Sequence, residues 1–176
     1  VLSNESSANE STVKGSDVNH QYSKSFQFEA DFDRYVKDYI GSQVAYFSLL
    51  RPWSEFQIAA YFSGLKAFHP YFRSCNAGSK TDSWCGHCAK CLFVALILTP
   101  FLTDGEISRI FGREILEDET LIPTLQELAG MTDEKPFECV GSREEICCAM
   151  ALGIRVREEK GLPLPKLLQY FQSTPL

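Results

Sequence analysis

Four cysteines in a short stretch form the clearest chemical pattern in this sequence. Cys85, Cys88 and Cys91 follow a C-x2-C-x2-C spacing, and Cys75 lies upstream of them. Four thiolates this close in the chain are the ligand set of a tetrahedral zinc site, in which each Zn–S bond is about 2.3 Å long. Because four protein ligands leave no open position for a substrate, the pattern predicts a structural zinc site.

Two other interpretations of these cysteines stay open. The same C-x2-C-x2-C run occurs in ferredoxin-like sequences, so an iron–sulfur cluster is the alternative metal centre. Reduced cysteines are also common in protein cores without any metal. The chain has seven cysteines, an odd number, and Cys147 and Cys148 are adjacent, which favours a reducing cytoplasm over a disulfide-linked secreted protein. His87 lies inside the motif, where it is expected on an exposed loop.

A second set of reactive side chains lies in the polar stretch of residues 3–25. Histidine as a residue type suits proton transfer near neutral pH, and a lysine can act as a base when desolvated or neutralise a phosphate or oxyanion, so His20 and Lys24 are the candidate catalytic residues. Five further residues are candidates for binding a substrate or nucleotide: Asn4, Glu5, Ser6, Asn19 and Ser23. The carboxylate of Glu5 suits a magnesium ion or a ribose hydroxyl. The alternative is a disordered polar linker, which this composition also permits.

The elements that must position these residues are mainly helices. Apolar residues at helical spacing over 32–40, followed by Gly41, predict an amphipathic helix. The apolar run 92–98, directly after the cysteines, predicts a buried helix that is too short to span a bilayer. Capping-box pairs or helical periodicity predict further helices over 54–65, 103–111, 121–129, 142–160 and 164–171. Residues 44–50 predict a short strand, so the chain is expected to be mainly α-helical with one or two short strands.

Length and charge restrict the functional classes. The 176 residues are enough for one domain, and the net charge of −6 argues against non-specific binding to nucleic acid or to anionic membranes. The sequence shows no signal peptide and no transmembrane run, which together with the cysteines indicates a cytoplasmic protein. The apolar start at Val1 and Leu2 resembles a strand leaving a sheet, where open α/β sheets place their ligands.

Four blocks of the sequence resemble one family of enzymes. They are SNESSANEST, VNHQYSKSFQFE, WCGHCAKCLFVALILTPFL and PFECVG, and together they resemble the UDP-N-acetylmuramoyl-L-alanyl-L-glutamate epimerases over nearly the whole chain. The cysteine block also resembles the C-terminal motif of some PP-loop ATP pyrophosphatases. One of these is the 7-cyano-7-deazaguanine synthase family, in which such a quartet binds zinc.

The resemblance implies a parent α/β fold of the adenine-nucleotide α-hydrolase type, with a parallel sheet flanked by helices. It also implies an isomerase that uses ATP and Mg²⁺, releases AMP and diphosphate, and inverts the terminal L-glutamate of UDP-MurNAc-L-Ala-L-Glu in peptidoglycan precursor synthesis. Residues 1–72 are then the end of the PP-loop-like region, with an active-site loop at 3–25, and residues 73–176 hold the cysteine knuckle and a helical region. Because the chain has no SGGxDS phosphate loop, we expect it to be the C-terminal portion of a longer protein and inactive alone.

Two further functions compete with the epimerase. The first is a PP-loop ATPase that modifies a nucleobase or deazapurine, which shares the cysteine motif but which the acidic charge disfavours where the substrate is RNA. The second is a zinc-knuckle interaction module without catalysis. That module needs an exposed recognition surface, whereas the apolar residues after the cysteines are typical of a core.

Overall fold

The computed structural model describes residues 1–6, 11–41 and 43–174. Their α-helices are α1 (Phe26–Tyr35), α2 (Glu55–Ser63), α3 (Ala89–Leu98), α4 (Asp104–Phe111), α5 (Ile122–Leu128), α6 (Arg143–Glu159) and α7 (Lys166–Ser173). The short helices are η2 (Tyr22–Lys24), η3 (Val36–Ile40), η4 (Lys66–Phe68), η5 (Ser79–Thr81), η6 (Ile115–Glu117) and η7 (Glu119–Leu121). In this described part, strand pairing is limited to two isolated bridges, Leu2 with Ser48 and Val13 with Glu134. The mainly helical expectation is confirmed, and the strand predicted over 44–50 contributes a single bridge.

Three helices begin at the capping boxes that the sequence predicts. At the start of α2, Ser54 Oγ accepts the backbone N–H of Gln57, and the Gln57 side chain accepts the backbone N–H of Ser54. The same reciprocal pair forms between Thr103 and Glu106 at α4 and between Ser142 and Glu145 at α6. Each pair satisfies two N–H groups that the first helical turn leaves without a partner, so these starts are fixed by local sequence.

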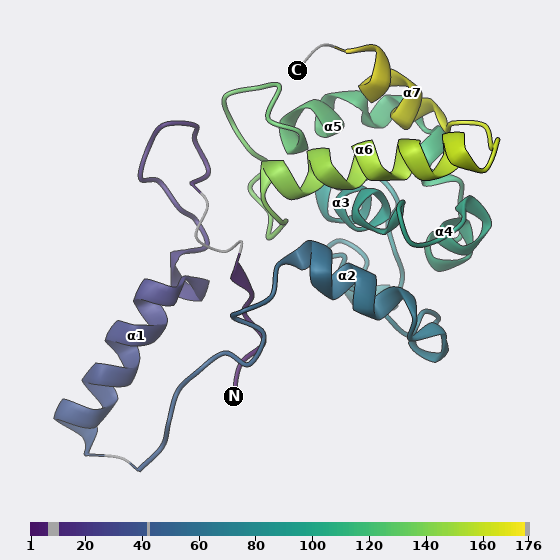
Figure 1. The fold of residues 1–176 in the computed structure, drawn as a ribbon. Helices are drawn as coiled ribbons and strands as arrows, with labels where there is room; N and C mark the ends of the chain where they lie inside the picture. The colour runs from purple at the N-terminus through teal and green to yellow at the C-terminus, as the bar shows by residue number, and fades with distance from the viewer. Residues whose placement is uncertain (7–10, 42, 175–176) are drawn as a thin grey trace.

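Helix α3 is the centre of the hydrophobic core. Every residue from Cys91 to Leu98 is buried, and α2, α4, α5 and α6 pack around the helix (Figure 1). The buried Arg157 of α6 secures its far end by donating to the carbonyl oxygen of Thr99 at 3.0 Å and by pairing with Asp104 at the start of α4. A buried guanidinium needs partners of this kind, because an unpaired buried charge costs several kcal/mol.

The N-terminal segment and α1 lie beside this helical body rather than within it (Figure 1). The Arg51 side chain connects three parts of this N-terminal region. It donates to the carbonyl oxygen of Glu5 at 2.7 Å, to the carbonyl oxygen of Lys24 at 2.9 Å and to the carboxylate of Glu29 at 2.7 Å. Glu29 is buried and also accepts the backbone N–H of Ser48 at 3.0 Å. Arg51 therefore holds the chain start, the end of the early loop and α1 in one arrangement.

The helix predicted over 32–40 is longer than its periodicity indicates. It begins at Phe26, because Ser25 Oγ accepts the N–H of Phe28, and its last turn widens into the π-type η3. Gly41 ends it in the left-handed conformation, with φ of 64°, as the sequence predicts. Across the described ranges, none of the helices has both the length and the apolar character that crossing a membrane requires.

Candidate functional site

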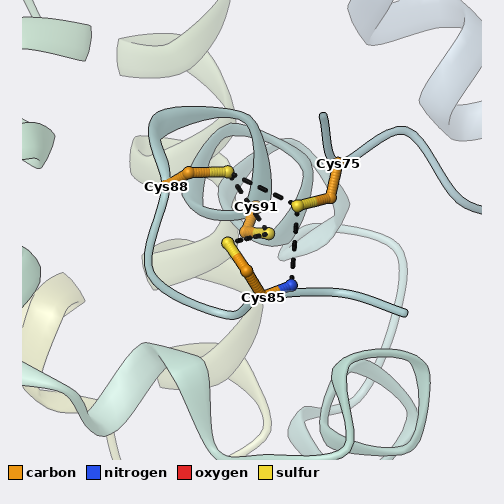
Figure 2. Close-up of side chains that lie close together, drawn as sticks. All are labelled: Cys75, Cys85, Cys88 and Cys91. Atoms are coloured by element: carbon orange, nitrogen blue, oxygen red, sulfur yellow. Dashed lines mark hydrogen bonds between the residues drawn. The ribbon is translucent and has the colours of Figure 1, made fainter. Parts of the chain in front are cut away.

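The sulfur atoms of Cys75, Cys85, Cys88 and Cys91 converge on one point, as their spacing predicts (Figure 2). All four lie within 4.8 Å of one another. Three Sγ–Sγ distances are 3.8 Å for Cys75 and Cys88, 3.7 Å for Cys85 and Cys91, and 3.5 Å for Cys88 and Cys91. A tetrahedron with Zn–S bonds of about 2.3 Å has sulfur–sulfur edges of about 3.8 Å, so the quartet fits one tetrahedral ion. A cluster of several iron atoms would hold its thiolates farther apart.

The backbone around the quartet points N–H groups at the sulfurs, which favours thiolates. Gly78 N–H donates to Cys75 Sγ at 3.2 Å, and Gly86 N–H donates to Cys91 Sγ at 3.4 Å. Gly86 has a φ of 75°, which favours glycine. A Cβ at Gly78 would lie 1.8 Å from the carbonyl oxygen of Ser83, so a side chain there would break the loop.

The protonation of these thiols is set by burial and by the same N–H groups. For Cys75, burial opposes ionisation, but hydrogen bonds from the N–H groups of Cys85 and Gly78 and from the side chains of Cys85 and Cys91 together lower the pKa to about 7. Burial raises the pKa of Cys88 to about 11 and raises that of Cys91 further. His87 is exposed, its Nδ1 lies 2.7 Å from the carbonyl oxygen of Cys85, and it is not among the residues whose ligand atoms converge.

His20 is bonded to the protein through both ring nitrogens. Nδ1 lies 2.7 Å from Thr12 Oγ1, and Nε2 lies 3.2 Å from the carbonyl oxygen of Glu138. Since a carbonyl only accepts, Nε2 carries the hydrogen in that bond. The ring also stacks on Phe137, with 4.5 Å between the ring centroids. This geometry makes His20 a support for residues 137–138, and a direct part in proton transfer stays a prediction.

Lys24 lies at the end of η2 and reaches the same distant segment. Its Nζ donates to Cys139 Sγ at 2.7 Å, although 115 positions separate the two residues in the sequence. Both side chains are partly buried. The early loop and the PFECVG segment therefore meet, with Lys24 on one side and Cys139 on the other.

Further titratable groups gather at this contact from the first turns of α2 and α3. We call Lys24, Glu55, Lys90, Glu138 and Cys139 the acid–base cluster. The backbone N–H of Lys90 donates to the Glu138 carboxylate at 3.1 Å, and burial lowers the pKa of Lys90. Burial raises the pKa of Glu55 to about 7. The negative charges of Glu5 and Glu145 raise it as well, whereas the positive charges of Lys90 and Lys24 lower it, so these groups all act on one small volume.

Glu55 makes a stability prediction possible. Its pKa is about 7 in the folded chain against an ordinary value of 4.5, so between these pH values the folded state binds more protons than the unfolded state. The free energy of unfolding of the native chain, relative to Glu55→Gln, should therefore fall as pH rises from about 4.5 to 7. The total change should reach at most about 3 kcal/mol, at 1.36 kcal/mol per pKa unit. Urea unfolding of both proteins at pH 5 and pH 8 measures it, and an equal pH dependence would refute the prediction.

The five candidate binding residues do not share one site. Glu5 lies at the acid–base cluster, where its charge acts on Glu55, and the backbone N–H of the neighbouring Ser6 donates to the carbonyl oxygen of Trp53 at 3.1 Å. The amide of Asn4 donates to Ser48 Oγ at 3.2 Å. Asn19 borders a polar hollow of about 430 Å³, and Ser23 is exposed on η2. Residues 7–10 of the early loop lie outside the described residues.

Four members of the acid–base cluster, Glu55, Lys90, Glu138 and Cys139, are absent from the residues that the sequence singles out. Glu55 follows a helix cap, where acidic residues are common because they complement the helix dipole. Lys90 lies between two cysteines of the quartet, which hides it within a metal motif. The sequence could have indicated Cys139, because it is the cysteine of the PFECVG block, which carries part of the family resemblance.

Comparison with known proteins shows the family to which this sequence is similar. Residues 71–169 match the family described as MurL C-terminal domain, and residues 1–49 match the MurL N-terminal domain. No solved structure gives a significant match to the chain.

Three curated relatives carry the name UDP-N-acetyl-alpha-D-muramoyl-L-alanyl-L-glutamate epimerase. The relative from Micromonospora sp. is 37% identical over 96% of this chain and 39% of its own length. Those from Xanthomonas oryzae pv. oryzae and Salinispora tropica are 41% and 40% identical, each over 86% of this chain and over 36% and 35% of their own lengths. The chain thus spans less than two fifths of the length of these relatives. Since the C-terminal match alone covers residues 71–169, more than half of the sequence, the chain belongs to the MurL family.

Proposed function

We propose that this chain contributes to an ATP-dependent epimerase that converts the terminal L-glutamate of UDP-MurNAc-L-Ala-L-Glu to D-glutamate. The observation that carries the proposal is the acid–base cluster, in which two lysines, a near-neutral carboxyl group and a thiol meet in a chain whose relatives are named as epimerases of this substrate. Inversion at a carbon atom needs one group that takes a proton and one that returns it. Groups held near neutral pKa suit both steps.

The chemistry explains why ATP would be needed. The α-proton of a glutamate is very weakly acidic, because removing it places negative charge beside an existing carboxylate. Converting that carboxylate to an acyl-adenylate, with release of diphosphate, removes the charge and creates a carbonyl that can delocalise the carbanion. Hydrolysis after inversion then releases AMP and restores the carboxylate. In this scheme Lys24 and Lys90 supply positive charge where the oxyanion develops.

We also propose that residues 1–6 and 47–53 belong to the edge of a parallel sheet of the adenine-nucleotide α-hydrolase type. The two segments run parallel at the bridge between Leu2 and Ser48, where Leu2 N–H donates to the carbonyl oxygen of Phe47 at 2.8 Å and Leu49 N–H donates to that of Leu2 at 2.9 Å. Ligands bind beyond the carboxyl ends of such strands. Glu5 lies near the carboxyl end of the first segment, and this position supports Glu5 as a ligand of Mg²⁺ or of a ribose hydroxyl.

The cysteine quartet is proposed to hold a structural Zn²⁺. The fit of its sulfurs to one tetrahedral ion supports zinc over an iron–sulfur cluster. Four thiolates close the site, so the ion would stabilise the start of α3 and take no part in the reaction. Since α3 also carries Lys90, the quartet would position one member of the acid–base cluster.

Turnover by the full-length protein tests this function. Incubated with UDP-MurNAc-L-Ala-L-Glu, ATP and Mg²⁺, it should produce D-glutamate in the acid-hydrolysed product together with AMP and diphosphate. Omitting ATP should abolish the inversion, because the free carboxylate does not activate the α-proton. Inversion without ATP would refute the adenylate, and failure to invert under any of these conditions would refute the epimerase.

A further inference from the structure

Cys139 differs from the other cysteines outside the quartet in its surroundings. Its sulfur accepts a hydrogen bond from the Lys24 ammonium group at 2.7 Å. Cys147 instead donates to the carbonyl oxygen of Ala129 at 3.4 Å, and Cys148 is exposed on α6. Reactive cysteines lie in electropositive and partly exposed surroundings, whereas inert cysteines are buried among apolar groups. Cys139 is partly buried and so combines a charged partner with access.

The segment that carries Cys139 is held on both sides. Before it, the carbonyl oxygen of Glu138 is bonded to His20 at 3.2 Å, and the Glu138 carboxylate accepts the N–H of Lys90 at 3.1 Å. After it, Val140 is buried in the core. A proton-transferring group must be positioned to a fraction of an ångström, and these contacts hold the residues on both sides of Cys139.

We propose that Cys139 is the catalytic base that removes the α-proton of the glutamyl residue, an inference that rests on the epimerase proposed above. The Cα–H bond breaks, an S–H bond forms, and the electron pair moves into the activated acyl carbonyl to give an enolate oxygen. Lys24 gives up its thiolate partner in this step and is left beside the new negative charge. To complete the inversion, a protonated carboxyl group returns a proton to the opposite face and becomes a carboxylate. Glu55 is the member of the acid–base cluster with this capacity.

Isotope exchange in the full-length protein tests the assignment. In deuterated solvent with ATP and Mg²⁺, Cys139→Ala should still release diphosphate from UDP-MurNAc-L-Ala-L-Glu, while its exchange of the α-proton falls at least about a hundredfold. Cys148→Ser is the matched control and should behave like the native protein. Exchange by Cys139→Ala at the native rate would overturn the proposal. A native protein that neither inverts nor exchanges would instead refute the epimerase, and this base assignment with it.

A chemical probe covers the case in which the alanine variant does not fold. In the native protein, iodoacetamide should alkylate Cys139 faster than Cys148, and activity should fall in proportion to the Cys139 modification followed by mass spectrometry. Lys24→Gln should slow alkylation of Cys139 about tenfold and leave that of Cys148 unchanged, because only Cys139 loses its cationic partner. Full activity in protein that is completely alkylated at Cys139 would overturn the proposal.

Discussion

Lys24→Ala in the full-length protein should lower the rate of epimerisation at least about a hundredfold, the lower scale for a positioned acid–base or charge-stabilising group. Lys24 Nζ lies 2.7 Å from Cys139 Sγ, and its charge also acts on Glu55, so the substitution removes a cation from the middle of the acid–base cluster. The fold should survive, because the Lys24 carbonyl oxygen that Arg51 binds at 2.9 Å belongs to the backbone.

The step that fails would identify the role of Lys24. If the variant still releases diphosphate but exchanges no α-proton with deuterated solvent, Lys24 acts on the carbanion. If it does neither, Lys24 acts on ATP or on adenylation. Lys14→Ala is a suitable control, since Lys14 is an exposed lysine of the same early loop. Normal turnover by Lys24→Ala would show that the early loop is only a connection and that the site lies elsewhere.

His20 should respond differently from Lys24. Its ring nitrogens are engaged by Thr12 and by the carbonyl oxygen of Glu138, so His20→Ala would release residues 137–138 and let Cys139 drift from its position. We therefore expect lower epimerisation with adenylation preserved, as for a positioning residue. The sequence alone assigns His20 a direct part in proton transfer because its type suits that chemistry; the hydrogen bonds indicate the indirect one.

Local sequence predicts the helices well because their ends are decided locally. The pairs Ser54 with Gln57, Thr103 with Glu106 and Ser142 with Glu145 each satisfy their own first turn, and each forms as expected. The cysteine quartet converges for a similar reason, since its members are close in the chain. By contrast, the start of α1 at Phe26 depends on the cap formed by Ser25, which the apolar periodicity from Phe32 onward does not reveal.

The acid–base cluster could not be predicted in this way, because it is assembled by contacts between distant segments. Lys24 and Cys139 are separated by 115 positions. Two further segments hold their surroundings: Arg51 binds the carbonyl oxygen of Lys24, and the backbone N–H of Lys90 binds the carboxylate of Glu138, next to Cys139. The shifted pKa of Glu55 depends first on its burial, a property of the packed helices rather than of its neighbours in the sequence. Residue type in the sequence indicated Lys24, and only the fold shows that Glu55, Lys90, Glu138 and Cys139 gather around it.

Removal of the metal should have a large effect on the stability of the protein. Cys91 has no exposed surface and is the first of the buried residues of α3, which continue to Leu98 at the end of that helix, so the quartet and the core share one helix. Loss of the ion would leave four inward-pointing thiols without the ligand that joins the loop to α3, because metal binding and folding of such a site are coupled. Cys88→Ser should therefore lower both the metal content and the melting temperature. A loss of about 3 kcal/mol corresponds to a shift of about 10 °C in the unfolding transition of a domain of about 150 to 250 residues.

Metal analysis and calorimetry of the full-length protein check this expectation against Cys148→Ser, which alters an exposed cysteine outside the quartet. The native protein should contain one zinc per chain, and Cys88→Ser should contain less. A brown protein with iron would favour the iron–sulfur alternative, and unchanged zinc in Cys88→Ser would refute the quartet as the binding site. Activity should fall together with the metal, although the quartet is proposed to be a structural site. The reason is that Lys90, adjacent to Cys91 in the first turn of α3, binds the Glu138 carboxylate through its backbone N–H at 3.1 Å. When that turn loosens, the acid–base cluster loses the contact that connects it to the core.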